Sequence, residues 1–206
     1  DNPSGALLER DDLLGLVAHC DQQGKRVIVD ESFMDFADPD RGCSLLASSH
    51  LHEFKNLVVI KSISKTYGVP GLRLGVLASG DPDLLVGLRQ DLPVWNINSL
   101  AEYFLQIYPA FRGQYRESCE RVRRERIRLK AALEQIAFLK VFPSQANYFL
   151  CELTSGLRAA ELAQFLLSKH DILIKELTAK NGFGHGQFIR IAIRSGPDND
   201  RLIAAL

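Results

Sequence analysis

Apolar residues follow two different patterns in the first half of the chain. Leucine and valine recur every three or four residues between positions 7 and 17, and Gly24 follows, which predicts an amphipathic helix. Val27–Val29 and Asn56–Ile60 are instead short apolar runs with polar residues after them, typical of buried parallel strands. A third run at 72–78 leads into a turn and another helix. Helices that alternate with buried strands predict a layer of the α/β class.

The second half of the chain has a different pattern. Residues 99–137 have mostly helical spacing, and we expect Pro109 and Gly113 to interrupt the helix. Beyond it, one amphipathic helix is predicted at 158–169. Short strands are expected at 138–142, 148–152, 172–177 and 188–194. The pattern therefore predicts two domains: a large α/β domain at 1–115, and a connecting helix with a small α+β domain at 116–206.

Composition narrows the class of protein. The chain has 206 residues, of which 46% are hydrophobic and 24% charged, so it can bury a substantial core and is not globally disordered. Its 25 basic and 25 acidic residues cancel, so charge does not point to nucleic acid or to an anionic membrane. No apolar run is long enough to span a bilayer. The expected partner is a small molecule, with no nucleic acid and no membrane.

Two minor features have simple interpretations. The cysteines form no C-x-x-C pair and no metal-ligand cluster with histidine, which favours a reducing, cytoplasmic setting and no metal site. The cysteines are Cys20, Cys43, Cys119 and Cys151. Arginines crowd residues 121–130 and would suit nucleic acid, but Glu125 interrupts them, so we favour a solvated helix face.

Residues 61–73 carry groups that could perform chemistry. Two serine hydroxyls, a glycine-rich turn and Arg73 follow a predicted strand, and together they could bind a phosphate. Lys65 could add a second cation or act as an amine nucleophile. Lys61 and Lys65 could equally be surface lysines of a polar loop. Asp30 ends the preceding strand, where a carboxylate can form an ion pair, ligate a metal or keep a pyridine nitrogen protonated.

The order of five separated motifs resembles one enzyme family. The motifs are Asn2-Pro3-Ser4-Gly5, Asp30-Glu31-Ser32-Phe33, Ser62-Ile63-Ser64-Lys65, Arg73 and Arg190. They are similar to those of class I/II pyridoxal-phosphate enzymes of fold type I, in the branch of histidinol-phosphate aminotransferase and threonine-phosphate decarboxylase. The resemblance implies the C-terminal part of the large domain, with a mostly parallel sheet flanked by helices, and the small α+β domain.

The resemblance also implies a cofactor, pyridoxal 5′-phosphate, and residues that bind it. Lys65 would be the catalytic residue, binding the cofactor covalently and moving a proton at the substrate α-carbon. Asp30 would pair with the pyridinium nitrogen, and Asn2 would donate to the phenolic oxygen. The cofactor phosphate would be bound by Ser62 or Ser64 together with Arg73.

Substrate-binding residues are implied in the same way. Arg190 would bind a substrate carboxylate through two hydrogen bonds, and Asn147 would line the substrate side of the site. Lys175 stands where the branch tends to have an arginine for a distal phosphate. Phe33 stands where the aminotransferases usually have tyrosine, a difference shared with the decarboxylases.

The implied activity is that of an aminotransferase acting on a phosphorylated or phosphonate amine or amino acid. The first alternative is a decarboxylase of a phosphorylated amino acid. The second is a catalytically silent fragment, because family members have a further stretch before the Asn-Pro turn with the first strands, a phosphate loop and a ring that stacks on the cofactor. A sheet without those strands has an open edge, so we expect a homodimer.

Overall fold

The computed structural model describes residues 1–41 and 44–206, so Cys43 lies outside the described residues. The chain divides into two compact units. Unit 1 consists of Asp1–Leu7 together with Glu120–Leu206, and unit 2 is Leu8–Cys119.

The first residues group with the C-terminal part rather than with the domain that follows them. The backbone N–H of Gln145 donates to the Gly5 carbonyl at 2.8 Å, and the Tyr148 hydroxyl donates to the Asp1 carbonyl at 2.8 Å. These long-range bonds have no signal in the local sequence pattern. The division at 115/116 into two functional domains stays a prediction.

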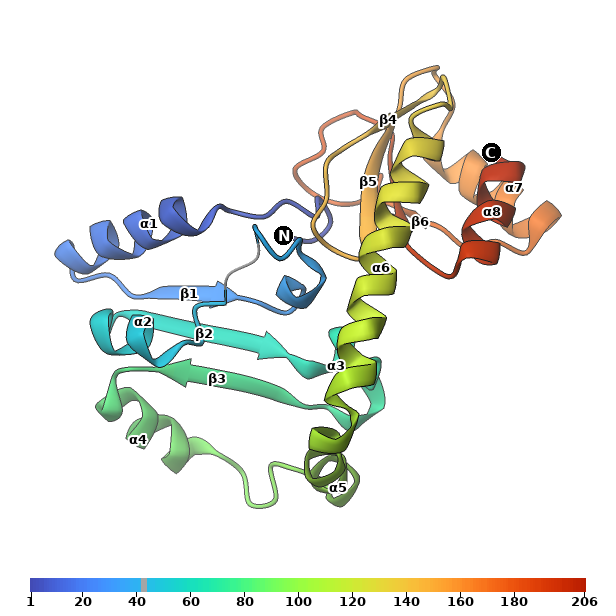
Figure 1. The fold of residues 1–206 in the computed structure, drawn as a ribbon. Helices are drawn as coiled ribbons and strands as arrows, with labels where there is room; N and C mark the ends of the chain where they lie inside the picture. The colour runs from blue at the N-terminus through green and yellow to red at the C-terminus, as the bar shows by residue number, and fades with distance from the viewer. Residues whose placement is uncertain (42–43) are drawn as a thin grey trace. The chain divides into compact units, whose positions relative to one another are not determined.

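Unit 2 contains a three-stranded sheet in the order β1-β2-β3 (Figure 1). Its strands are β1 Val27–Asp30, β2 Leu57–Ser62 and β3 Gly75–Ser79. β1 and β2 are parallel, as expected, whereas β3 runs antiparallel to β2. The chain turns back between them through the four-residue helix α3 and the 3₁₀ turn η2, without the long crossover helix that a parallel pair needs.

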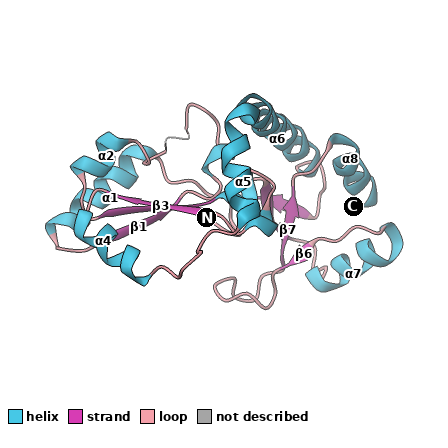
Figure 2. Cartoon of the chain, turned by 90° about the horizontal axis from the view of Figure 1, so that it is seen from below, coloured by secondary structure: helices cyan, strands magenta, loops and turns pink. Residues whose placement is uncertain are grey.

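Helices cover this sheet, and Figure 2 shows α2 on one side of it and α4 on the other. The helical segments of unit 2 are α1 Arg10–Gln22, η1 Met34–Phe36, α2 Ser48–Glu53, α3 Ile63–Thr66, η2 Pro70–Leu72, α4 Pro82–Asp91, α5 Ser99–Ile107 and η3 Tyr108–Phe111. The core consists of Leu13, Val17, Leu45, Leu57 and Val59. The expectation that both first strands are buried is wrong for β1, because it is an edge strand of this sheet and its Ile28 is 66% exposed.

Unit 1 contains a fully antiparallel sheet in the order β4-β5-β7-β6. The strands are β4 Leu139–Val141, β5 Tyr148–Leu153, β6 Lys175–Glu176 and β7 Phe188–Ala192, so the strand expected at 172–177 is shorter than predicted. Two further helices are α7 Ala159–His170 and α8 Gly196–Ala205. Buried residues of β5, β7, α7 and α8 form one core, which includes Phe149, Leu166, Ile189, Ile191 and Leu202.

Helix α6, Arg112–Leu133, begins in unit 2 and continues into unit 1. The predicted interruption at Pro109 is present, because α5 ends at Ile107 and η3 carries this proline, whereas the expected interruption at Gly113 is wrong, because Gly113 lies inside α6. Arg126 corrects the expectation of a solvated basic face. It is 3% exposed, and its guanidinium donates to the Ala146 carbonyl at 3.5 Å and to the Gln145 side chain at 3.3 Å. Among the described residues, no helix combines the length and the apolar character needed to cross a membrane.

Candidate functional site

The ends of β1 and β2 carry the first group of candidate residues, here named the strand-end group: Asp30, Ser62, Ser64 and Lys65. Asp30 Oδ1 accepts from the Ser32 backbone N–H at 2.8 Å. The Ser32 hydroxyl in turn accepts from the Ser62 backbone N–H at 2.9 Å. Because these bonds join the two strand ends, Asp30 and the Lys65 loop lie at the same edge of the sheet.

Lys65 lies on α3, a helix of only four residues. The helix packs inward through Ile63 and Ser64, whereas the Lys65 side chain is exposed. The Lys65 ammonium lies 4.5 Å from the centre of the Phe33 ring, a cation–π contact. The amine is therefore open to a ligand and rests on an aromatic face that has no hydroxyl.

Arg73 follows η2 and is exposed. Its backbone is left-handed, with φ 56° and ψ 44°, a conformation that costs a non-glycine residue roughly 1 kcal/mol. Its Nη1 donates to the Pro70 carbonyl at 3.4 Å, a long bond that holds the side chain weakly. Strain of this kind is often found at functional sites.

The second group lies in unit 1 and is here named the sheet-face group: Asn2, Asn147, Lys175 and Arg190. Arg190 is in the middle of β7, where it pairs with Leu150 of β5 on one side and Lys175 of β6 on the other. Its Nη1 donates to Asn2 Oδ1 at 2.8 Å, and its guanidinium carbon lies 5.0 Å from the centre of the Tyr148 ring. Two ladders and two side-chain contacts fix this arginine.

Lys175 and Arg190 occupy directly opposite positions of an antiparallel pair, so their side chains project from the same face of the sheet. Both residues line a groove of about 640 Å³ between α7 and the β6–β7 edge, together with Gln164 and Leu167. Asn147 is half-buried, and its carbonyl accepts from the Ile193 N–H at 2.8 Å. This face therefore presents two cations beside a cavity.

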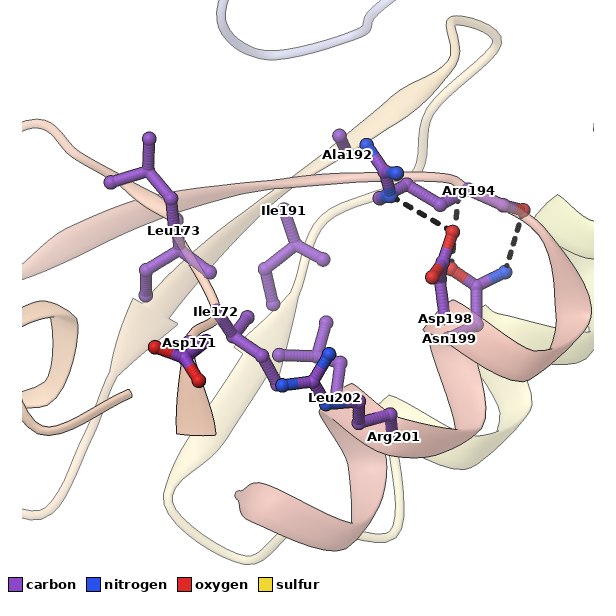
Figure 3. A pocket seen from close by; sticks show the side chains of 11 residues that line it. Asp171, Ile172, Leu173, Ile191, Ala192, Arg194, Asp198, Asn199, Arg201 and Leu202 are labelled. Atoms are coloured by element: carbon purple, nitrogen blue, oxygen red, sulfur yellow. Dashed lines mark hydrogen bonds and ion pairs between the residues drawn. The ribbon is translucent and has the colours of Figure 1, made fainter. Parts of the chain in front are cut away.

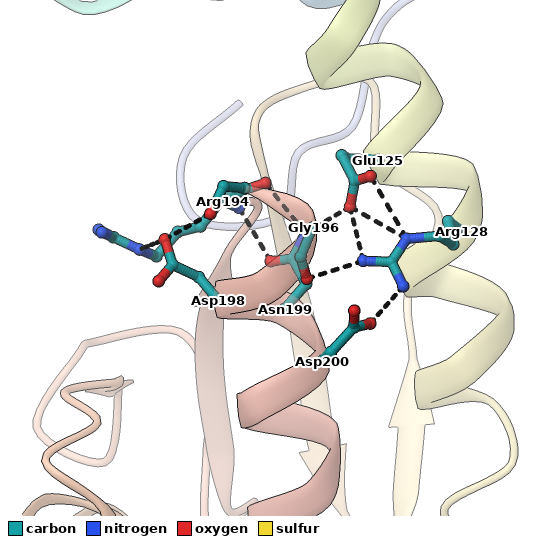
Figure 4. Close-up of polar contacts among 8 residues, drawn as sticks. Glu125, Arg128, Arg194, Gly196, Asp198, Asn199 and Asp200 are labelled. Atoms are coloured by element: carbon teal, nitrogen blue, oxygen red, sulfur yellow. Dashed lines mark hydrogen bonds and ion pairs between the residues drawn. The ribbon is translucent and has the colours of Figure 1, made fainter.

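A polar network that the sequence pattern did not reveal holds the end of β7 (Figure 4). Asn199 of α8 is buried; its Oδ1 accepts from the Arg194 N–H at 3.0 Å, and its Nδ2 donates to Glu125 at 2.8 Å. Arg128 donates to the same Glu125 at 2.8 Å. Hydrogen bonds from Arg128, and then from Asn199, lower the pKa of Glu125. The network attaches β7, and with it Arg190, to α6 and α8.

A second groove of unit 1, of about 310 Å³, lies between the chain before β6 and helix α8 (Figure 3). Its floor is apolar, with Ile191 and Leu202. The charged groups around it already have partners: Arg194 pairs with Asp198 at 3.1 Å, and Arg201 donates to the His170 carbonyl. The two acidic side chains of the lining, Asp171 and Asp198, balance the charges of its two arginines, so the groove has no net charge to attract a charged ligand.

Lys61 corrects the interpretation that both lysines of the 61–73 segment are surface groups. It is largely buried and donates to Asp35 Oδ1 at 2.6 Å. Asp35 also accepts from the hydroxyl of Tyr115. Both members of this ion pair are close in the sequence to residues of the quoted motifs: Lys61 is four residues before Lys65, and Asp35 is two residues after Phe33. This proximity is the one signal that the sequence offered for the pair.

The structure thus brings the predicted residues together in two groups, one within each unit. The joint action of both groups on one ligand is a proposal, taken up below. Among residues 1–41 and 44–206, no group of three or more histidine, cysteine, aspartate or glutamate side chains could hold a metal ion.

Comparison with known proteins shows relatives over most of the chain. The chain is 39% identical over 180 residues to CMP-5′-(3-aminopropyl)phosphonate synthase of Streptomyces rubellomurinus, covering 87% of this chain and 28% of that protein. It is 33% identical over 210 residues to L-serine phosphate decarboxylase of Campylobacter jejuni, covering 100% and 53%. The crystal structure of histidinol-phosphate aminotransferase from Clostridium acetobutylicum matches with a TM-score of 0.89 at 27% identity, covering 100% and 60%.

The chain spans only part of the length of these proteins, from 28% to 60%. The high TM-score assigns its fold to the fold type I class of pyridoxal-phosphate enzymes. A model of the family "Aminotransferase class I and II" matches residues 1–206, and this family implies pyridoxal 5′-phosphate as the cofactor. The chain therefore belongs to the class I and II aminotransferase family of pyridoxal-phosphate-dependent enzymes.

Proposed function

We propose that the chain is part of an enzyme that removes the carboxylate, as carbon dioxide, from an amino acid that also carries a phosphate or phosphonate group. The observation that carries the proposal is the position of Lys175 directly opposite Arg190 on one sheet face. Two cations on one face match a substrate with two anionic groups.

The relatives support this choice of substrate and reaction. All three are named for a phosphate or phosphonate compound, and one of them is named a decarboxylase. The Phe33 ring beneath Lys65 supports it too, because aminotransferases of the resembling branch usually have tyrosine at that position.

The strand-end group fits pyridoxal phosphate in kind. Lys65 offers an exposed amine to the aldehyde, and Asp30 offers an exposed carboxylate to a protonated ring nitrogen. The Asn2 amide nitrogen can donate to the phenolic oxygen, because its Oδ1 accepts from Arg190. The phosphate would be bound by the hydroxyl of Ser62 or Ser64 together with the guanidinium of Arg73.

The chain's own residues then have separate tasks. When bound, the cofactor supplies an electron sink for the pair left at the substrate α-carbon by bond cleavage. Asp30 would hold the proton on the ring nitrogen. Arg190 would orient the substrate carboxylate, and Lys175 would hold the distal anion. The Lys65 amine would deliver the proton that the α-carbon receives after carbon dioxide leaves.

Product analysis tests the proposal. The protein with pyridoxal phosphate would receive O-phosphoserine or its phosphonate analogue, each with a labelled carboxyl carbon, and serine as the control without a second anion. We expect labelled carbon dioxide from the first two compounds, little from serine, and no keto acid. A Lys175→Gln variant should lose most of the preference over serine. Equal rates on all three compounds would contradict the assignment of the two cations.

Transamination of a phosphorylated amine or amino acid is the second candidate. Its support is the TM-score of 0.89 to a structure named a histidinol-phosphate aminotransferase. Transamination and decarboxylation use the same fold and cofactor. The same experiment separates the two reactions: keto acid without carbon dioxide, formed when a 2-oxo acid accepts the amino group, would replace the decarboxylase by an aminotransferase.

Homodimer formation in the cytoplasm completes the proposal. Large apolar side chains, among them Val94, Trp95 and Leu100, are exposed on unit 2 and could be covered by a second copy. Cys20 and Cys151 are free thiols, which suits a reducing compartment. Light scattering of the purified protein measures the first part, with twice the chain mass as the expected result.

A further inference from the structure

Asp35, in η1, accepts hydrogen bonds from two separate elements of unit 2. The Lys61 ammonium of β2 donates to Oδ1 at 2.6 Å, and the Tyr115 hydroxyl of α6 donates to Oδ2. The Lys61 side chain is 11% exposed and that of Asp35 is 23% exposed. A largely buried carboxylate with two donors is held much more firmly than a surface ion pair.

Both donors lead to Lys65, from opposite directions along the chain. Lys61 precedes Lys65 by four residues on the strand that runs into α3. On the other side, Tyr67 follows Lys65 by two residues, and its ring stacks on that of Tyr115 with 4.2 Å between centres and 9° between planes. The segment that carries the amine is therefore fixed at both ends through Asp35.

Helix α3 needs such support. Four residues are too few to form a stable helix alone, and its N-cap residue Ser62 makes no side-chain capping bond. Its position must come from neighbouring elements. η1 is also next to Phe33, whose ring contacts the Lys65 ammonium at 4.5 Å. The same short turn thus supplies both the anchor of the α3 segment and the surface on which the amine rests.

The Tyr115 hydroxyl stays a donor over the range in which enzymes work. Burial, and then its hydrogen bond to Asp35, raise the pKa of Tyr115. Burial likewise raises the pKa of Tyr67. The Tyr115 hydroxyl therefore keeps its proton and can donate to Asp35 throughout that range.

We infer that Asp35 is the positioning residue of the Lys65 amine, and that Tyr115 and Lys61 act through it. Asp35 sets the direction from which the amine approaches the cofactor aldehyde, and so the rate at which the two condense. The inference rests on the proposed cofactor role of Lys65, and it holds for decarboxylation and transamination alike.

Two ligands separate positioning from general structural support. Pyridoxal phosphate condenses with the amine, whereas pyridoxine phosphate has an alcohol in place of the aldehyde and binds without reacting. Tyr115→Phe removes one donor to Asp35 and keeps the aromatic stack. We expect condensation, followed by absorbance and by borohydride trapping at Lys65, to slow roughly tenfold. The affinity for pyridoxine phosphate should stay within about twofold of wild type, since its binding uses no amine.

Matched variants complete the test. Tyr103→Phe removes a hydroxyl from a tyrosine of α5 that is 61% exposed, and should change neither ligand's behaviour. Asp35→Leu with Lys61→Met and Tyr115→Phe replaces the ion pair, and the hydroxyl that donates to it, by apolar groups, which can preserve folding stability. Its melting temperature should therefore approach that of wild type while condensation stays slow.

The possible failures are distinct. Equal condensation rates in wild type and in both Asp35-network variants would overturn the positioning role of Asp35 alone. Parallel losses for pyridoxal phosphate and pyridoxine phosphate would also overturn it, because they indicate a general structural role. A wild-type protein that traps no cofactor at Lys65 would overturn the proposed function together with this inference.

Discussion

The strand-end group of unit 2 and the sheet-face group of unit 1 are built on different supports. Lys65 stands on a four-residue helix whose position depends on neighbouring side chains. Arg190 stands in the middle of a strand with a hydrogen-bonded ladder on either side. The position of the Lys65 amine therefore depends on individual side-chain contacts, whereas the position of Arg190 depends on the hydrogen-bonded backbone of the sheet.

Replacing the amine is the most severe test of this contrast. Lys65→Ala should remove borohydride-trapped cofactor at this position and lower turnover by roughly a thousandfold, because no other group replaces the nucleophile and proton carrier. Mass spectrometry of the trapped peptide and carbon dioxide release are the measurements. Lys55→Ala, at an exposed lysine, is the control. Full turnover of Lys65→Ala would show that the catalytic amine lies elsewhere.

A milder change tests the role of Arg190, which the strands of the sheet hold in position. Arg190→Lys keeps the charge but loses the two-donor geometry, so KM for the anionic substrate should rise roughly tenfold to a hundredfold. Cofactor trapping at Lys65 should be unchanged. Arg194→Lys, in the same segment but paired with Asp198, is the matched control. If both variants have the same KM, Arg190 does not bind substrate.

The network behind β7 offers a test of stability. Asn199→Ala leaves the Arg194 N–H without its acceptor and removes one donor from the Glu125 carboxylate, which keeps Arg128, so the free energy of unfolding of unit 1 should fall by about 1–3 kcal/mol. Urea denaturation with a probe in unit 1 measures this loss. Asn181→Ala, at an exposed asparagine, should have almost no effect. An equal loss in the two variants would remove Asn199 from the support of Arg190.

The smallest expected effect is a dependence on pH. The pKa of Glu125 is lowered by Arg128 and Asn199, so the ionised carboxylate stabilises the fold above its unfolded pKa. This contribution, about 0.5 kcal/mol for a pair that solvent still reaches, should be lost as the pH falls through the folded-state pKa, which lies below the ordinary glutamate value of 4.5. Glu125→Gln should flatten the stability curve in that window. An unchanged curve would mean that other carboxylates dominate acid unfolding.

Local patterns predicted much of the fold. The parallel β1–β2 pair, the interruption near Pro109 and the small second sheet follow from hydrophobic spacing and from proline chemistry. The reversal of β3 was not predicted, because an apolar run does not encode strand direction. The burial of Arg126 was also missed, since its partners are about 20 residues away in the sequence.

The sequence likewise pointed to some residues of the candidate site and not to others. Lys65, Asp30 and Arg73 are predicted from the sequence because they stand at strand ends or turns and match ordered motifs, and their roles stay predictions. Asp35 and Asn199 were missed because their importance comes from partners far away in the sequence, such as Tyr115, 80 residues later. Sequence reasoning identifies residues that face a ligand more readily than residues that hold them in place.

The left-handed backbone at Arg73 sets folding stability, which favours glycine, against the presence of a guanidinium at the same position. Glycine would adopt a φ of 56° without the strain of roughly 1 kcal/mol. In a turn without a functional side chain, we therefore expect substitutions to glycine to accumulate. Arginine at this position therefore lowers the folding stability relative to glycine. Saturation mutagenesis of codon 73 can separate the effect on stability from the effect on activity. Variants selected for heat resistance should converge on glycine, and variants selected for growth that depends on the enzyme's making its product should return to arginine.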